Sequence, residues 1–426
     1  MIDKIKTKFK SKNNRTLLSN FISLSILQGA NFILPLLAVP YLIRVLGVEL
    51  YGLLTFATAM IMYLTILSDY GFNLTATREI SIHRNSKDKV VEIFSSVMII
   101  KIVLMFIGLM LLTILVFSFD RFQEDWKVYF LTFGMVLGQV LFPVWFFQGM
   151  EKMKYISILN IFAKSVFLIF IFIYVKEKED YYLVPLFNSL GFIISGIIAL
   201  YYIKSEFKIS FKLQSLDILK YYLVDGWHIF ISRIAVVLYT SSNIFILGLF
   251  TNNTLVGYYA IAEKVVSAIS SLGAIVNQVL FPYLSKIWIQ NRQIYYNKFY
   301  KILKSIIIIM FFIFLFLYFL APTIINFLSG IEIGESIQIL QILAITVIFF
   351  PLGGLFTQSF VTQRNNIYVT KATIYTSFVN ILLVFILIPL YGIYGLATTV
   401  VLVQFFQVTL NTMYFNKLKR ISLCVE

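Results

Sequence analysis

Long apolar stretches alternate with short polar segments along the whole chain. Each stretch is about as long as the roughly 20 residues that a helix needs to cross the hydrocarbon core of a bilayer. We therefore predict an all-α polytopic membrane protein with about twelve transmembrane helices. The predicted spans are residues 17–43, 50–70, 91–117, 128–149, 155–175, 181–203, 221–250, 255–283, 302–328, 336–361, 368–389 and 392–415. The first lacks a small-residue cleavage pattern, so we expect a span and not a cleaved signal peptide.

The charges of the polar segments predict the orientation. If the amino terminus is cytoplasmic, 26 Lys and Arg residues lie in inner segments and 5 in outer loops, and the outer loops hold nine acids. This is the positive-inside pattern, which predicts a multi-pass protein of the cytoplasmic (inner) membrane with both termini in the cytoplasm. The net charge of +15 is therefore explained by membrane topology and contact with anionic membrane lipids, and we expect no nucleic-acid partner.

Several kinds of chemistry are disfavoured. Cys424 is the single cysteine, and His83 and His228 form no metal-binding motif, so we expect neither a metal site nor a cofactor. The loops are too short for an extramembrane catalytic domain, so we expect a protein that is not an enzyme.

The two halves of the chain resemble each other weakly. Gly52 and Gly257, each close to a tyrosine at the start of a span, are 205 residues apart, and Pro143 and Pro351 are 208 apart. We therefore expect two parallel repeats, a bundle of six helices in 1–204 and a second in 205–426. Repeats of this kind are typical of transporters, in which the substrate binds between the halves.

Ionisable residues inside the spans are the candidate functional residues, because a charge within the bilayer is costly and needs a reason. Arg233 lies 12 residues into the seventh span and Lys264 lies 9 residues into the eighth, about 18 Å and about 14 Å at 1.5 Å per residue. Both are near the midplane and could face one cavity. With Lys101 and Lys164, they favour an anionic ligand such as phosphate or pyrophosphate.

Structural alternatives remain open for these charges. Lys101 and Lys164 could extend to the inner surface, and Glu263 could form a structural bridge with Arg233. Asp225 and His228 could lie at the interface, and Asp69 could anchor the end of the second span. The functional alternative is an ion or proton relay formed by the acids, which are Asp69, Asp225 and Glu263.

A set of short motifs, in order along the spans, resembles a known family. The motifs are Leu46-Gly47 with Tyr51-Gly52, Gly71-Phe72, Arg78-Glu79-Ile80-Ser81, Trp145-Phe146-Phe147-Gln148-Gly149, Ala262-Glu263-Lys264 and Ile388-Pro389-Leu390-Tyr391-Gly392. With them the chain resembles the polysaccharide flippases of the multidrug/oligosaccharidyl-lipid/polysaccharide exporter superfamily, in particular the O-antigen (Wzx-type) flippases. The first span lacks the early cationic residues of the lipid II flippases. The first and tenth spans lack the acids of the drug exporters.

The resemblance implies two six-helix bundles around a cationic cavity. It implies that an undecaprenyl-pyrophosphate-linked oligosaccharide moves from the inner to the outer leaflet by alternating access, coupled to a proton or sodium gradient, and that the polysaccharide polymerase is a candidate partner. Lys264 and Arg233 would bind the pyrophosphate, and Lys264 matches a position where relatives keep a cation. The inner approach would be lined by Lys164, Lys101 and Arg78. Arg44, at the outer rim, would guide the glycan or anchor its helix. Coupling would involve Glu263, Asp225 and Asp69.

Two other functions remain alternatives. A cation-coupled multidrug exporter of the same fold would bind lipophilic cations, which a cavity rich in Lys and Arg disfavours. A membrane polysaccharide polymerase would need an exposed catalytic loop, and no loop is long enough.

Overall fold

The computed structural model describes residues 34, 37–240 and 242–424. Most of the first predicted span, including Pro35, lies outside the described residues, and its carboxyl-terminal part is the short apolar helix Leu37–Leu46. The described residues form helices and no strands. The prediction of an all-α fold is therefore confirmed for the described part of the chain.

Within the described residues, nine helical segments are long and apolar enough to cross a membrane. Ten of the twelve predicted spans coincide wholly or in large part with these nine segments, and the segment Asn366–Ile421 covers the last two. That segment is broken at Gly392, whose φ of 55° and ψ of −129° are not helical, so the predicted boundary coincides with the kink. The described residues of the seventh predicted span are helical on both sides of residue 241, with Asp225 and Arg233 in Leu216–Thr240 and the remainder in Ser242–Phe250.

Two compact units divide the chain. Unit 1 contains the described residues of Met1–Tyr41 and Ala57–Ile234, and unit 2 contains Leu42–Phe56 and Ala235–Glu426. Three described helices cross the limits of the units: Leu37–Leu46, α3 (Val48–Asp69) and α11 (Leu216–Thr240). The other helices of unit 1 are α4 (Phe72–His83), α5 (Lys87–Ser118), α6 (Asp120–Gln123), α7 (Trp126–Leu141), α8 (Val144–Gly149), α9 (Met153–Tyr174), η1 (Lys178–Tyr182) and α10 (Leu183–Ser205).

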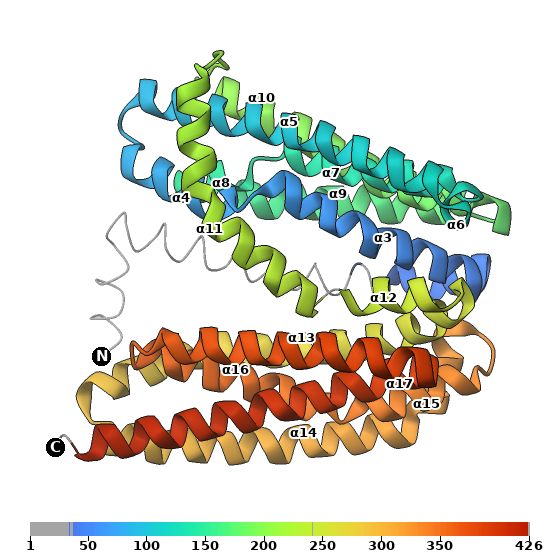
Figure 1. Ribbon diagram of the computed structural model, residues 1–426, viewed down its shortest axis with the longest axis vertical. Coiled ribbons are helices and arrows are strands. Elements are labelled where there is room, and N and C mark those ends of the chain that lie inside the picture. The colour runs from blue at the N-terminus through green and yellow to red at the C-terminus, as the bar shows by residue number, and fades with distance from the viewer. Residues whose placement is uncertain (1–33, 35–36, 241, 425–426) are drawn as a thin grey trace, which may run out of the picture. The chain divides into compact units, whose positions relative to one another are not determined.

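In unit 1, α10 packs along both α7 and α9 (Figure 1). Glycines bring these helices close, since a Cβ on Gly138 would lie 2.5 Å from the Cβ of Phe192. A Cβ on Gly191 would lie 2.5 Å from the carbonyl oxygen of Ala163. Small residues have this role in membrane bundles, where close backbone packing replaces the hydrophobic driving force between helices. Buried aromatic residues of this unit pack around Trp145, which is fully buried.

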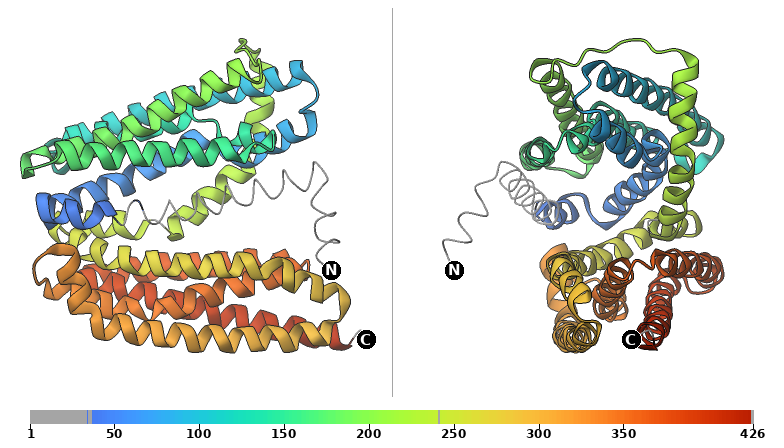
Figure 2. Two further views of the ribbon diagram at one scale, coloured as in Figure 1. Left: turned by 180° about the vertical axis from the view of Figure 1, so that it is seen from behind. Right: turned by 90° about the vertical axis from the view of Figure 1, so that its left-hand side faces the viewer.

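Unit 2 contains α12 (Ser242–Phe250), α13 (Asn253–Gln290), α14 (Arg292–Ser329), α15 (Gly334–Ala344), α16 (Thr346–Thr362) and α17 (Asn366–Cys424). Its long helices, coloured yellow to red in Figure 2, lie side by side. Pro351 lies inside α16, and its carbonyl oxygen accepts a 2.9 Å hydrogen bond from the buried amide of Asn277 on α13. A polar group inside a membrane protein needs such a partner, because lipid offers none.

The amino-terminal ends of α3 and α13 also meet inside unit 2. They meet at Gly52 and Gly257, the glycines that occupy similar positions in the two halves of the chain. A Cβ on Gly52 would lie 1.9 Å from the carbonyl oxygen of Asn253, and one on Gly257 would lie 2.2 Å from that of Val48. The backbone of each helix thus packs directly against a glycine of the other helix. A side chain at either glycine would push the two helices apart.

Candidate functional site

A sharp break between α3 and α4 positions the first charged groups of unit 1. Tyr70 and Gly71 have positive φ values of 48° and 83°. A Cβ on Gly71 would lie 2.7 Å from the side chain of Ile229 on α11, and the Tyr70 ring stacks on Phe230 at 4.6 Å between centroids. The break therefore holds the start of α4 against α11, and charged side chains of both helices meet beyond it.

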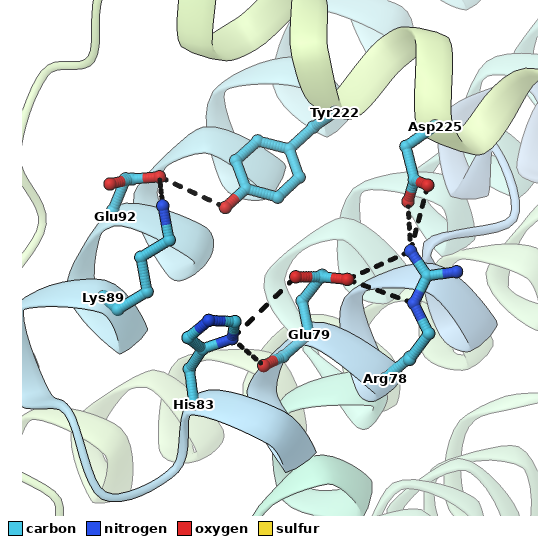
Figure 3. Close-up of polar contacts among 7 residues, drawn as sticks. All are labelled: Arg78, Glu79, His83, Lys89, Glu92, Tyr222 and Asp225. Atoms are coloured by element: carbon cyan, nitrogen blue, oxygen red, sulfur yellow. Dashed lines mark hydrogen bonds and ion pairs between the residues drawn. The ribbon is translucent and has the colours of Figure 1, made fainter.

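These side chains form the α4–α11 cluster, which is shown in Figure 3 and consists of Arg78, Glu79, His83, Lys89, Glu92, Tyr222 and Asp225. Nη2 of Arg78 lies 2.9 and 2.8 Å from the two carboxylate oxygens of Asp225. Nε of Arg78 donates to Oε1 of Glu79 at 3.0 Å. The guanidinium is thus held by two carboxylates, although its side chain stays 51% exposed.

The third carboxylate of the cluster, that of Glu92, joins α5 to α11. Oε1 of Glu92 lies 2.6 Å from Nζ of Lys89 and accepts a 3.3 Å hydrogen bond from the Tyr222 hydroxyl (Figure 3). Nδ1 of His83 lies 3.9 Å from the carboxylate of Glu79. Three carboxylates therefore face two permanent cations and one histidine, an arrangement that suits a proton or a cation better than it suits an anion.

A buried ion pair lies elsewhere in unit 1. Nζ of Lys101 is 3.5 Å from Oδ1 of Asp69, and the Lys101 side chain is only 4% exposed. Asp69 also accepts a 2.8 Å hydrogen bond from the Asn73 amide. An unpaired lysine at this depth would be costly. Asp69 compensates the charge of Lys101. Lys101 is therefore poorly placed to attract an anionic ligand.

The structure therefore joins two predicted substrate cations to two predicted coupling acids, Lys101 to Asp69 and Arg78 to Asp225. Lys164 is half-buried on α9 and Arg233 is exposed on α11. Arg233 belongs to unit 1, whereas Glu263 and Lys264 belong to unit 2.

Glu263 and Lys264 are both half-buried on α13. Oε1 of Glu263 accepts a 2.8 Å hydrogen bond from the Ser267 hydroxyl, one turn along the same helix. Among the described residues, no carboxylate lies within ion-pair distance of Lys264. Its charge therefore lacks the compensation that Lys101 and Arg78 receive.

Arg44 has a structural partner within unit 2. Its guanidinium donates to the carbonyl oxygen of Phe327 in the last turn of α14 and lies 5.8 Å from the centroid of the Phe327 ring. The last carbonyls of a helix have no partner inside the helix, so Arg44 supplies one. This placement fits the anchoring alternative for Arg44.

Sequence reasoning did not select Glu79, Glu92 or Tyr222 as site residues. The i,i+3 spacing of Lys89 and Glu92 could have identified the pair on a helix face. Nothing local indicates Tyr222, because α5 and α11 are far apart in the chain and meet only in the fold.

Comparisons with known proteins identify the family. The family described as "Polysaccharide biosynthesis protein" matches residues 17–288. A protein of Escherichia coli (strain K12) named "Putative O-antigen transporter" is 35% identical over 280 residues, which cover 66% of this chain and 68% of the relative. A protein of the same name from Shigella dysenteriae is 27% identical over 391 residues, which cover 90% of this chain and 96% of the relative.

Solved structures share the fold. The lipid II flippase MurJ in an inward closed conformation has a TM-score of 0.69 at 15% identity, over 94% of this chain and 87% of MurJ. An inward-facing multidrug resistance MATE family transporter of the MOP superfamily has a TM-score of 0.68 at 14% identity, over 91% of this chain and 98% of the transporter. The matched relatives are transporters, so the chain is a multi-pass membrane transporter and not an enzyme. The family match over residues 17–288 and the two O-antigen transporter relatives show that this chain belongs to the polysaccharide biosynthesis protein family, among its O-antigen (Wzx-type) flippases.

Proposed function

We propose that this protein moves an undecaprenyl-pyrophosphate-linked oligosaccharide, the repeat unit of an O-antigen or a similar surface polysaccharide, from the inner to the outer leaflet of the cytoplasmic membrane. Membership of the family and the named relatives support the class of cargo. In this proposal both termini are cytoplasmic. The six-helix bundles, 1–204 and 205–426, alternate access to the substrate, and the polysaccharide polymerase receives the flipped unit.

The observation that carries the proposal is the uncompensated charge of Lys264. Within the described residues, Lys101 and Arg78 face carboxylates at 3.5 and 2.8 Å, whereas Lys264 has none within ion-pair distance. A half-buried ammonium without a carboxylate favours an anion that can enter and leave. A pyrophosphate group meets this requirement, and the exposed guanidinium of Arg233 is a second cation for it.

The carboxylates of unit 1 suit the coupling step. Asp225 accepts from Arg78 in the present arrangement, and protonation of Asp225 would remove one of the two carboxylates that hold the guanidinium. A proton could thus weaken the connection between α4 and α11. We propose Asp225 and Glu263 as the coupling acids, with Asp69 keeping Lys101 neutralised through the cycle. A sodium ion would compete with Arg78 for the same carboxylate oxygens.

The test uses cells that lack this protein and complements them with variants. We expect Lys264→Ala to lower transport by roughly 10- to 100-fold, since hydrogen bonds to charged groups contribute about 1.5–3 kcal/mol. Lys264→Arg should retain part of the activity because the charge stays. Lys371→Ala, which removes an exposed lysine of α17, is the matched control and should transport normally. The readout is the leaflet in which complete lipid-linked units accumulate, together with the amount of surface glycan.

Each result separates one function from another. Complete units that accumulate on the inner leaflet of the deleted strain would support translocation. Units that reach the outer leaflet but stay unpolymerised would favour a polymerase, and unchanged glycan with altered dye retention would favour a drug exporter. Normal transport by Lys264→Ala at normal membrane levels would refute the role of Lys264.

A further inference from the structure

An open groove with a volume of about 430 Å³ lies between α13 and α14 of unit 2. The two helices are joined at Asn291 and run antiparallel, so each contributes one face to the groove. The lining residues of α13 lie at i, i+4 and i+7 from Val276, and those of α14 begin at Lys298 and end at Ile309. The groove therefore has a defined direction, with one end toward the connection of the helices and the other along the apolar span.

The end toward the connection is polar. Lys298 and Lys301 lie three residues apart on α14, so both ammonium groups are on one face, and Tyr283 lies across from them on α13. All three residues are exposed. The span predicted for α14 starts at residue 302, which places this polar end at the level where the membrane-spanning part of the helix begins.

The other end is mainly apolar, and its one polar lining residue, Ser305, donates its hydroxyl to the carbonyl oxygen of Lys301 on the same helix. From Lys301 to Ile309 the groove extends eight residues along α14, about 12 Å at 1.5 Å per residue. The facing part of α13 contributes Leu280 and Val276. Ile309 is 56% exposed and Val276 is 44% exposed, so this part of the groove is open to the surrounding hydrocarbon. Cationic and apolar groups thus follow one another along the groove.

The two lysines have no acidic neighbours in this part of the chain. Between Glu263 and Glu332 the sequence contains no Asp or Glu and six Lys or Arg residues. Among the described residues, neither Lys298 nor Lys301 is within ion-pair distance of a carboxylate. Their charges are therefore left for an anion from outside the protein.

The polar end fits a phosphate better than a sugar. An ammonium group only donates hydrogen bonds, whereas sugar hydroxyls need acceptors as well, and no carboxylate or amide side chain lines the groove. An oxygen-rich anion matches the two lysines and the tyrosine hydroxyl, and a hydrocarbon chain matches the apolar end. Basic pockets between membrane helices are suited to anionic lipid heads.

We propose that this groove binds an anionic phospholipid of the bilayer, with the phosphate at Lys298 and Lys301 and the start of an acyl chain along Ile309. This site is distinct from Lys264 and does not depend on the transported substrate, so its test is a binding measurement and not a transport assay.

The experiment uses the full-length protein purified in detergent and titrated with phosphatidylglycerol or phosphatidylcholine of the same acyl chains, with bound lipid counted by native mass spectrometry. The test variant is Lys298→Gln/Lys301→Gln. The matched control is Lys304→Gln, which removes an exposed lysine of the same helix that does not line the groove. At about fivefold per cation near a lipid surface, the double variant should bind phosphatidylglycerol roughly 25-fold more weakly. Its weak binding of phosphatidylcholine should not change.

The outcomes either support the site or overturn it. A selective loss in the double variant, with the control unchanged, supports it. Equal loss in the Lys304→Gln control, or equal binding of the two lipids by the unmodified protein, would mean that the attraction is not specific to the groove. Displacement of phosphatidylglycerol by an equal concentration of glycerol phosphate would show that only a free phosphate is recognised. Tighter binding of an undecaprenyl phosphate, lost in the double variant, would assign the groove to the carrier lipid and refute the proposal.

Discussion

The contact between Gly52 and Gly257 predicts that a single methyl group will disturb unit 2. In Gly52→Ala, the new Cβ would lie 1.9 Å from the carbonyl oxygen of Asn253, whereas ordinary contacts begin at 3.4 Å. The two helices would have to separate by about 1.5 Å at this point. The obstacle is backbone, so no side chain can rotate away to make room.

Two opposing effects decide whether Gly52→Ala stabilises or destabilises the protein. Alanine favours a helix over glycine by roughly 0.5–1 kcal/mol, whereas overpacking a tight contact costs about 1–3 kcal/mol. Because backbone faces backbone, we expect the upper part of that range and a net loss of about 2 kcal/mol. In a detergent melting experiment on a chain of 426 residues, this should lower the midpoint by roughly 2 °C.

The matched control is Gly334→Ala, at a helix start where a Cβ would meet nothing within 4 Å. It should melt at or slightly above the temperature of the unmodified protein. Gly257→Ala should resemble Gly52→Ala, and the double variant should lose less than the sum, because one separation of the helices relieves both contacts. If Gly52→Ala melted like Gly334→Ala, the close approach of α3 and α13 would be refuted.

Three further predictions concern unit 1. Arg78→Asp and Asp225→Arg should each reduce complementation, and the two combined should partly restore it. The half-exposed pair contributes only about 0.2–1 kcal/mol to stability, so the single variants should fail through lost function and not through unfolding. A double variant no better than the single variants would exclude a functional contact. Asp69→Asn should lower the protein level in the membrane, because it leaves the buried Lys101 without a carboxylate at a cost of about 3 kcal/mol. Adding Lys101→Met should restore the level. An unchanged level in Asp69→Asn would contradict the buried pair. Gly71→Ala should lower the melting temperature, since a φ of 83° costs a residue with a Cβ about 1–2 kcal/mol, and an unchanged melting temperature would argue against the break between α3 and α4.

Apolar stretch lengths were sufficient to predict the membrane helices, because a bilayer imposes the same length requirement on every span. Ten predicted spans fall in described helical segments, and even the break at Gly392 coincides with a predicted boundary. The described residues of the seventh predicted span are also helical, in Leu216–Thr240 and Ser242–Phe250.

The sequence by itself also indicated which ionisable residues lie within the predicted spans, and these include Asp69, Lys101 and Asp225 of the ion pairs. It did not determine which charges compensate one another. Asp69 and Lys101 are 32 residues apart and Arg78 and Asp225 are 147 apart, so only helix packing decides that each cation meets an acid. The same holds for Gly52 and Gly257, whose similarity was visible in the chain but whose contact was not. Composition fixes what each helix can bury in lipid, whereas side-chain partners depend on which helix faces meet, and that is settled only when the helices pack.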